Sequence, residues 1–388
     1  MSRKYGRVRE FRAGMGPAIK EAKFSLKRVS KSPLSVVGIA IIVLFALIAI
    51  FADFIAPPVT RDPMTMWHDG YSAIPLPPGT AVLDPVARKA GWTIHYLGTA
   101  ELQLDIFYGI IWGTRTAFRV GIVVQGVSII LGIAIGSVSG YYGGAIDEFM
   151  MRLTDIVLAF PGLVLSMALV IALPRIWPVD IGFMLVLVTV LVAPGIIGRI
   201  FKVSGRWVLL ATLVSFIAFI TLEGYVFAAP VWTLNMELSQ LDKVLIALAI
   251  IGWPGYCRVI RGETLRVKQE AYVEAAKAVG CSDLRIIVRH IFPNSIYPVV
   301  IMASLGIGGT VLTAAALSFL GIGAPQGYAD WGQMISFARN WIWAGFQDPW
   351  KYWYTFTIPG IAIFFFVLGW NLLGDALRDI LDPTLRRR

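Results

Sequence analysis

The sequence contains few charged side chains and few of the residues that bind metal ions or form disulfides. Asp, Glu, Lys and Arg make up only 15% of its 388 residues, whereas soluble domains contain about 25%. The two cysteines, Cys257 and Cys281, and the three histidines match no metal-binding spacing, so we expect no metal site. These shortages exclude a soluble enzyme and a disulfide-built secreted domain. Because 57% of the residues are hydrophobic and the mean hydropathy is +0.72, the sequence predicts a membrane protein.

Groups that carry chemistry are also scarce. The chain has no Gly-Lys dipeptide, and therefore lacks the Gly-x-x-x-x-Gly-Lys-Ser/Thr loop that binds the phosphates of ATP. Its apolar runs hold almost no ionisable residues apart from Asp155 and Glu223 near their ends. This disfavours a self-contained secondary transporter, because such proteins place ionisable groups near mid-membrane. A membrane-embedded hydrolase would need a set of catalytic groups that is not found, so we predict no catalytic residues.

Eight apolar runs are candidate membrane spans. They are residues 34–52, 120–145, 156–173, 181–198, 207–222, 244–257, 296–328 and 352–374. The fourth contains Pro194-Gly195, and the fifth has only 16 uncharged residues, which cover about 24 Å of a hydrocarbon core about 30 Å thick. The segment 181–231 therefore either crosses the membrane twice or forms a re-entrant hairpin.

The distribution of positive charge predicts the orientation of these spans. The formal net charge is +10, and with both termini inside, 25 of the 34 Lys and Arg residues lie inside and 9 outside. Cytoplasmic loops of membrane proteins are enriched in Lys and Arg. We therefore expect both termini in the cytoplasm, and we interpret the basic excess as an orientation signal rather than as a nucleic-acid site.

The chain divides into five predicted parts. They are a basic cytoplasmic tail (1–33), an anchor helix (34–56), an external loop or small lobe (57–115), a transmembrane domain (116–378) and a cytoplasmic C-terminal tail (379–388). A second external loop, 323–351, contains Trp331, Trp341, Trp343 and Trp350. Tryptophan is enriched at membrane interfaces, so we expect interfacial anchors here rather than an aromatic ligand site.

The loop 258–293 is charged and helix-permissive although it lies between two spans. Its alanines favour a helix, which Gly280 is expected to end. Ser282 or Asp283 can cap a second helix, which Pro293 is expected to close. Glu270 and Glu274 repel each other four residues apart, at a cost of about 0.2–0.5 kcal/mol, which a basic groove on a partner could offset. On spacing alone, an ordinary cytoplasmic helical hairpin fits equally well.

The sequence of this loop carries a family resemblance. Glu274-Ala275-Ala276, then Gly280, then His290-Ile291-Phe292-Pro293 resembles the EAA loop of ABC-importer permeases, in the form of the dipeptide/oligopeptide/nickel branch. Phe292 stands where leucine is usual. Further resemblances to this branch lie at 25–58, 97–115, 151–170, 252–256, 317–321, 331–332 and 371–383.

The chain departs from the branch at two places. In the segment before the second span, the Asp, Gly and Arg positions of the family pattern are occupied by Ala100, Gln103 and Leu104. We therefore assign no external function to these three residues. Residues 174–240 match nothing in the branch, and we predict an inserted helical pair at about 181–231. The resemblance then implies an all-α polytopic bundle like a type I ABC-importer permease, with six family spans plus this pair.

The resemblance implies a function that the composition alone does not. The chain would be a non-catalytic permease subunit forming half of a pathway for di- or oligopeptides, with oligosaccharides or nickel complexes as the alternative substrates. The EAA loop would dock on the ATPase through Glu270, Glu274, Ala275, Ala276, Lys277, Gly280, Asp283, His290 and Pro293. The implied partners are a second, related permease, two ATPase subunits that bind the ATP and Mg, an extracytoplasmic substrate-binding protein and the lipid of a bacterial or archaeal cell membrane.

Candidate hinge and pathway residues lie within the spans. Pro-Gly pairs occur at Pro161-Gly162, Pro194-Gly195, Pro254-Gly255 and Pro359-Gly360. Proline loosens a helix, although Pro and Gly are common in membrane helices in any case. Ser304, Gly308 and Thr310 either line a polar pathway or serve close helix packing, as small residues usually do in membranes.

Overall fold

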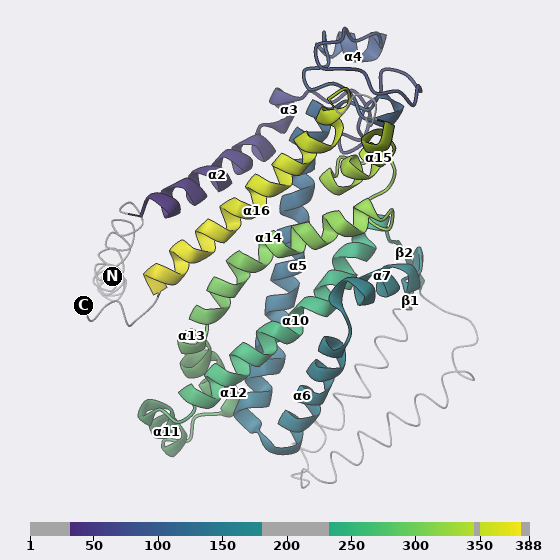
Figure 1. Ribbon diagram of the computed structural model, residues 1–388. Coiled ribbons are helices and arrows are strands. Elements are labelled where there is room, and N and C mark those ends of the chain that lie inside the picture. The colour runs from purple at the N-terminus through teal and green to yellow at the C-terminus, as the bar shows by residue number, and fades with distance from the viewer. Residues whose placement is uncertain (1–31, 181–232, 345–349, 382–388) are drawn as a thin grey trace, which may run out of the picture. The chain divides into compact units, whose positions relative to one another are not determined.

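The computed structural model describes residues 32–180, 233–344 and 350–381 of the chain (Figure 1). Within these ranges the protein is mostly helical, as predicted, and five helices are long and apolar enough to cross a membrane. They are α2 (Pro33–Ile50), α5 (Ile106–Tyr142), α10 (Gln240–Val267), α14 (Tyr297–Phe319) and α16 (Trp353–Leu381). A bent pair, α6 (Gly144–Ala159) and α7 (Gly162–Ala172), passes the same test with a 94° angle between its halves.

Six of the eight predicted spans overlap these helices. The runs 181–198 and 207–222 lie outside the described residues. The total of eight spans therefore stays a prediction.

The longest helix, α5, packs along α10 over a stripe of small residues. It contains 37 residues, which at about 1.5 Å per residue makes it about 55 Å long. Gly132, Gly136 and Gly140 face α10, and a Cβ at Gly136 would lie 2.5 Å from the carbonyl oxygen of Cys257. The backbones of the two helices therefore approach more closely than any larger side chain would allow.

Trp331 is buried within the bundle and does not face outward as an interfacial anchor would. It begins α15 (Trp331–Ala344) and is only 3% exposed. Its ring packs against Phe45 of α2 and Phe366 of α16, and its indole N–H donates to the carbonyl of Ile110 in α5. The prediction of an interfacial anchor is wrong for this residue, because its indole nitrogen has a buried partner. Trp350, by contrast, is 78% exposed.

Residues 57–105 fold into a small lobe at one end of the bundle (Figure 1). The lobe contains the short helices α4 (Pro85–Lys89) and η1 (Glu101–Gln103), and α3 (Ala52–Ile55) leads into it from α2. It joins the segment before α15, since the amide of Met66 donates to the carbonyl of Gly327 and that of Ala329 to the carbonyl of Met64. The two segments predicted to be external thus lie together.

The helix α5 begins earlier than the sequence indicated. The predicted external segment ran to residue 115, whereas α5 starts at Ile106, capped by the Asp105 carboxylate, which accepts the amide of Tyr108. Arg115 does not interrupt the helix, because its guanidinium donates to the carbonyl of Ala49 and pairs with Asp53. The position of Arg115 in the sequence therefore did not show where the lobe ends and α5 begins.

A buried histidine holds the lobe to the start of α5. His95 is fully buried and lies between two carboxylates, with Nδ1 2.7 Å from Asp105 and Nε2 3.3 Å from Asp69. Its ring stacks on Trp67. Burial alone lowers the pKa of His95, but the hydrogen bonds and charges of Asp105 and Asp69 outweigh it and raise that pKa above 6.5. The protonated imidazole can donate to both carboxylates at once.

We expect the lobe to loosen as the pH rises. A group whose pKa is raised by folding stabilises the folded state fully below its unfolded pKa of 6.5, and this contribution is lost as the pH rises through the folded value. The measurement is the amide-exchange protection factor of lobe peptides at pH 6 and pH 9. His95→Gln should remove the pH dependence and His68→Gln should leave it. Equal protection at both pH values in the unmodified chain would contradict the prediction.

One departure from the family pattern coincides with an unusual backbone. Gln103, at the position of the pattern's glycine, has a φ of +55°, and Leu102 before it has +61°. Such left-handed conformations suit glycine and cost other residues free energy. Gln103 therefore adopts a conformation that the glycine of the pattern would adopt at a lower cost.

Residues Ala172–Ser239 form a separate compact unit. Their described ends pair as an antiparallel ribbon, β1 (Ile176–Asp180) with β2 (Thr233–Glu237), in a register that places Ile176 opposite Glu237 and Asp180 opposite Thr233. The sequence did not predict these strands. The bounds of the unit are close to those of the segment 174–240, in which the sequence predicted an insertion, and the predicted pair within 181–231 lies outside the described residues.

Candidate functional site

The EAA motif forms the helix α11 (Ala271–Ala278), and its glycine ends that helix as predicted. Gly280 has a φ of +79°. Its amide donates to the carbonyl of Lys277, while the amide of Cys281 donates to that of Ala276. This pair of hydrogen bonds is the Schellman arrangement, which requires a left-handed residue at the position that Gly280 occupies. The glycine therefore sets where the chain turns back.

One face of α11 is buried and the other is open. Val273 and Ala276 pack into a small cluster with Val267, Ile286 and Ile291. The opposite face is exposed and carries predicted coupling residues, namely Glu270, Glu274, Ala275, Lys277 and Gly280. The helix thus presents a low, alanine-lined surface flanked by carboxylates.

The rest of the loop is helical but broken into short pieces. After α12 (Asp283–Ile286) follow a π-helical turn, η2 (Ile287–Ile291), and α13 (Phe292–Ser295). Pro293 does not close a helix, as the sequence led us to expect; it lies in the first turn of α13, where no amide is needed. The π turn before it is wider than an α-helical turn and joins α12 to α13. His290, in this turn, is half-buried, and its carbonyl accepts a hydrogen bond from the Asn294 side chain.

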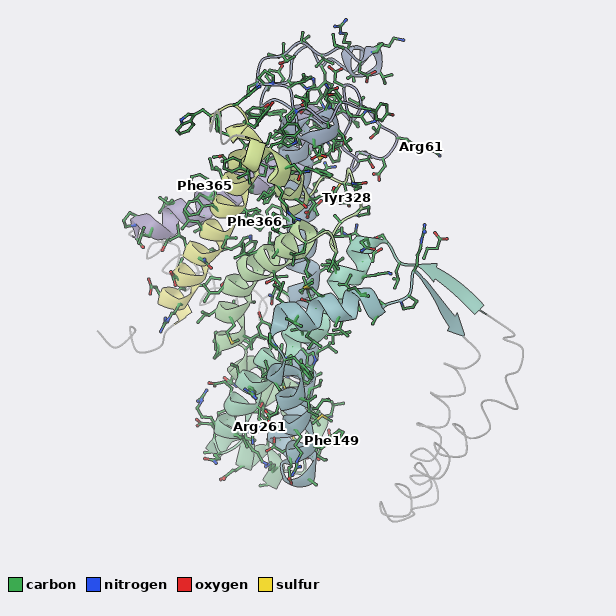
Figure 2. All side chains as sticks on the ribbon, turned by 45° about the vertical axis from the view of Figure 1, so that its right-hand side comes forward. Arg61, Phe149, Arg261, Tyr328, Phe365 and Phe366 are labelled. Atoms are coloured by element: carbon green, nitrogen blue, oxygen red, sulfur yellow. The ribbon has the colours of Figure 1, made fainter. Side chains whose placement is uncertain are left out.

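The loop and the 57–105 lobe lie at opposite ends of α5 (Figure 1). Near one end, Trp112 donates to the carbonyl of Ala56 and Thr116 to that of Ala329. At the other end, Tyr141 donates to Asp283. Figure 2 shows the same separation, with Arg61 and Tyr328 at one end and Phe149 and Arg261 at the other. Since α5 is about 55 Å long, the two regions can lie on opposite sides of a membrane.

Two ion pairs join α6 to α10 close to the loop. Arg261 binds Asp147 with both arms of its guanidinium, at 2.5 and 2.6 Å. Ser139 of α5 donates to the same carboxylate, so three helices meet at Asp147. Arg258, one turn before Arg261 on α10, pairs with Asp155, and their side chains are 49% and 63% exposed. These contacts fix the position of α6 relative to the helix that leads into α11.

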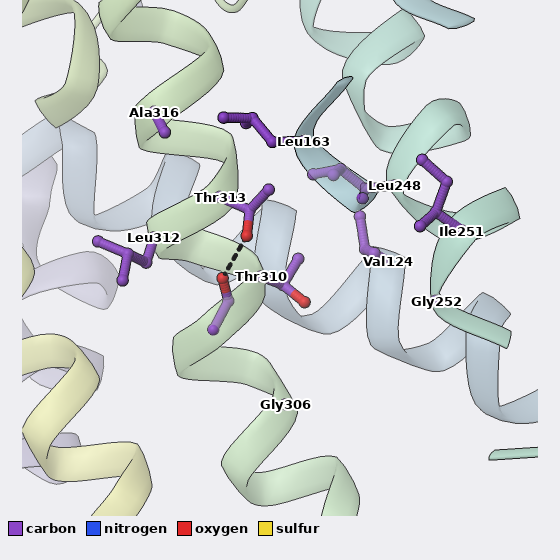
Figure 3. A pocket seen from close by; sticks show the side chains of 12 residues that line it. Val124, Leu163, Leu248, Ile251, Gly252, Gly306, Thr310, Leu312, Thr313 and Ala316 are labelled. Carbon is purple, nitrogen blue, oxygen red and sulfur yellow. Dashed lines mark hydrogen bonds between the residues drawn. The ribbon is translucent and has the colours of Figure 1, made fainter. Parts of the chain in front are cut away.

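A cavity of about 470 Å³ lies between α5, α7, α10 and α14 (Figure 3). Its wall is mainly aliphatic side chains and glycines, together with the two threonines Thr310 and Thr313. The hydroxyl of Thr313 donates to the carbonyl of Gly309 in its own helix. Thr310 accepts from Gln125, which in turn accepts from Tyr256. The cavity therefore has an apolar wall with one polar edge.

The predicted hinge and pathway residues fall into different environments. Pro161 lies at the break between α6 and α7, and Gly162 lines the cavity with Thr310. Pro254 and Pro359 lie inside the continuous helices α10 and α16. Two glycines lie at contacts between helices, Gly308 beside Val367 and Gly255 beside Met302. The hydroxyl of Ser304 donates to the carbonyl of Ile301 in its own helix. Pro194 lies outside the described residues.

Sequence reasoning missed the residues that attach the loop to the bundle. Tyr141, Asp147 and Arg261 are far apart in sequence, and none belongs to the EAA pattern. The sequence offered no clear signal, because Asp147 stands beside Glu148 and Arg261 lies between Arg258 and Glu263. Only the fold brings each of these residues beside its partner.

Comparison with known proteins identifies the class of this chain. Residues 132–387 match the family described as the inner membrane component of binding-protein-dependent transport systems. Residues 23–78 match the N-terminal transmembrane domain of oligopeptide transport permease C. The chain therefore belongs to this family of ABC-importer permease subunits, which are non-catalytic membrane components. This confirms the resemblance and the multi-pass helical fold.

Individual relatives cover nearly the whole chain. It is 31% identical to a dipeptide transport system permease protein of Alkalihalophilus pseudofirmus, over 95% of this chain and 92% of the relative. It is 29% identical to an oligopeptide transport system permease protein of Bacillus subtilis, over 97% and 96%. A glutathione transport system permease protein of Pectobacterium atrosepticum is 32% identical over 75% and 73%. All three relatives are named for peptide substrates.

Proposed function

We propose that this chain forms half of the translocation pathway of an ATP-driven importer of di- or oligopeptides. The observation that carries the proposal is α11, an exposed, alanine-lined helix at the end of the bundle opposite the 57–105 lobe. A protein surface can approach the exposed alanines Ala271, Ala275 and Ala278 closely, because their side chains are short. The peptide names of the relatives support the substrate class.

The remaining parts of the transporter are proposed from the family and from charge. The face of α11 that carries Glu274 docks on an ATPase subunit, which binds the ATP and Mg. A second permease completes the pathway, and an extracytoplasmic binding protein delivers the substrate to the side of the 57–105 lobe. The distribution of Lys and Arg supports placing α11 and both termini in the cytoplasm of a bacterial or archaeal cell.

The test reverses one charge on α11. The chain is purified from membranes with its partner permease and ATPases, and Glu274→Arg is compared with Glu148→Arg, an exposed residue of α6 outside the loop. Truncating one member of a buried charge pair at an interface costs about 2–5 kcal/mol, or roughly a thirtyfold or greater loss of affinity, and reversing the charge adds repulsion to that loss. Glu274→Arg should therefore lose the ATPases and ATP-driven uptake, while the control keeps both.

Uptake assays in proteoliposomes separate the alternatives. Labelled tri-alanine should accumulate when the binding protein and ATP are present. If an oligosaccharide or a nickel complex accumulates instead, the proposed substrate class is wrong, but the proposed coupling to the ATPase still holds. Tri-alanine uptake without ATP, unchanged by Glu274→Arg, would identify a self-contained transporter and overturn the proposal.

A further inference from the structure

Tyr141, in the last turn of α5, contacts the coupling loop before, on and after α11. Its hydroxyl donates to Asp283 at 2.6 Å, just after α11. Its carbonyl accepts from Lys268, just before α11. The ammonium of Lys277, on α11 itself, lies 5.3 Å from the centre of the ring. One residue of α5 thus contacts the segments on both sides of the short helix, and Lys277 in its last turn.

The ring of Tyr141 is also part of the loop's own core. It is 6% exposed and belongs to the cluster that holds Val273 and Ala276 of α11. Tyr141 makes two hydrogen bonds between α5 and the loop, one through its hydroxyl and one through its carbonyl. Two of the predicted coupling residues, Lys277 and Asp283, therefore also contact α5 within this chain.

Without such a contact, a movement of α11 could be absorbed at its two ends. Residues 268–270 form a turn between α10 and α11, and Gly280 forms another after it. Both are short non-helical joints at which α11 could swing. Contacts on both sides of a joint make the joined parts move as one body, and α5 packs tightly along α10 through its glycine stripe.

We propose that Tyr141 is a positioning residue that clamps α11 to the α5–α10 pair, so that displacement of α11 moves both helices. The proposal rests on the proposed docking of an ATPase on α11. It assigns to Tyr141 a role in transmission rather than in docking, because the residue is buried. The far end of α5 lies at the 57–105 lobe, so the same clamp connects the loop with that lobe.

The experiment follows α11 and α5 separately in the assembled transporter. Amide exchange is measured for peptides covering α11 and the last two turns of α5, with and without trapping of the ATPases by ATP and vanadate. In the unmodified chain, trapping should change exchange in both segments. In Tyr141→Phe, which removes only the hydroxyl, the change at α11 should persist and that at α5 should fall about tenfold, the effect of one hydrogen bond to a carboxylate.

Tyr142→Phe is the matched control, because Tyr142 is the next residue and is 51% exposed. It should behave as the unmodified chain. Asp283→Ala should reproduce Tyr141→Phe, and combining the two should add nothing further, as expected for one shared contact. Undiminished transmission to α5 in Tyr141→Phe would overturn the clamp. If trapping changes nothing at α11 even in the unmodified chain, the docking proposal itself fails.

Discussion

Gly136→Val is expected to force α5 away from α10 and to lower the stability of the bundle around the loop. A Cβ at this position would lie 2.5 Å from the carbonyl oxygen of Cys257 and 3.1 Å from the Cβ of Ile260. A flexible side chain could move aside, but a backbone carbonyl inside a helix cannot move without breaking its own hydrogen bond. Overpacking costs about 1–3 kcal/mol even where neighbours can adjust, and we expect the upper end of that range or more.

Thermal unfolding of the purified chain in nanodiscs, followed by the fluorescence of its 13 tryptophans, measures this effect. The control is Gly126→Val in the same helix, where nothing lies within 4 Å of an added Cβ. Because glycine is the poorer helix former, that control should be neutral or slightly stabilising. A similar melting temperature for the two variants would show that α5 and α10 are not in close contact.

The glycine stripe also shows how far the sequence could predict the fold. Apolar runs located six spans, because the cost of burying polar groups in lipid leaves a local composition signal. Gly280 was assigned correctly because a helix end is a local event. Gly136 was not, since glycine is common in membrane helices and its partner lies in another helix.

The loop shows the same division between local and distant contacts. Alanine content and Gly280 predicted α11, whereas the turn at Pro293 was misjudged because the preceding π turn depends on packing. Trp331 was misjudged for a similar reason, since its indole partner in α5 is distant in sequence. Tyr141 carried no signal at all, because only the fold brings the end of α5 beside Asp283.

Arg261→Glu is expected to detach α6 from α10 and to lower the stability of the chain. The change places a carboxylate where Asp147 now receives both arms of a guanidinium. Breaking a buried pair costs about 3–5 kcal/mol. The Arg261 side chain is 32% exposed and that of Asp147 17%, so solvent screening reduces the expected loss to about 1–3 kcal/mol.

A surface ion pair within α6, the helix that contains Asp147, provides the control. Arg152 pairs with Glu148 four residues away, but their side chains are 74% and 64% exposed. Arg152→Glu should therefore change stability by less than about 0.5 kcal/mol. The same nanodisc unfolding measurement compares the two variants.

The exchanged pair, Arg261→Glu with Asp147→Arg, distinguishes charge pairing from packing. If the attraction between the two groups holds α6, the double variant should recover at least half of the lost stability. Recovery should be incomplete, because Ser139 donates to the Asp147 carboxylate and would meet a guanidinium instead. No recovery, together with an equally large loss for Arg152→Glu, would mean that α6 is positioned by its apolar contacts alone. In that case the bend at Pro161, and not the pair with α10, would determine where α6 lies beside the loop.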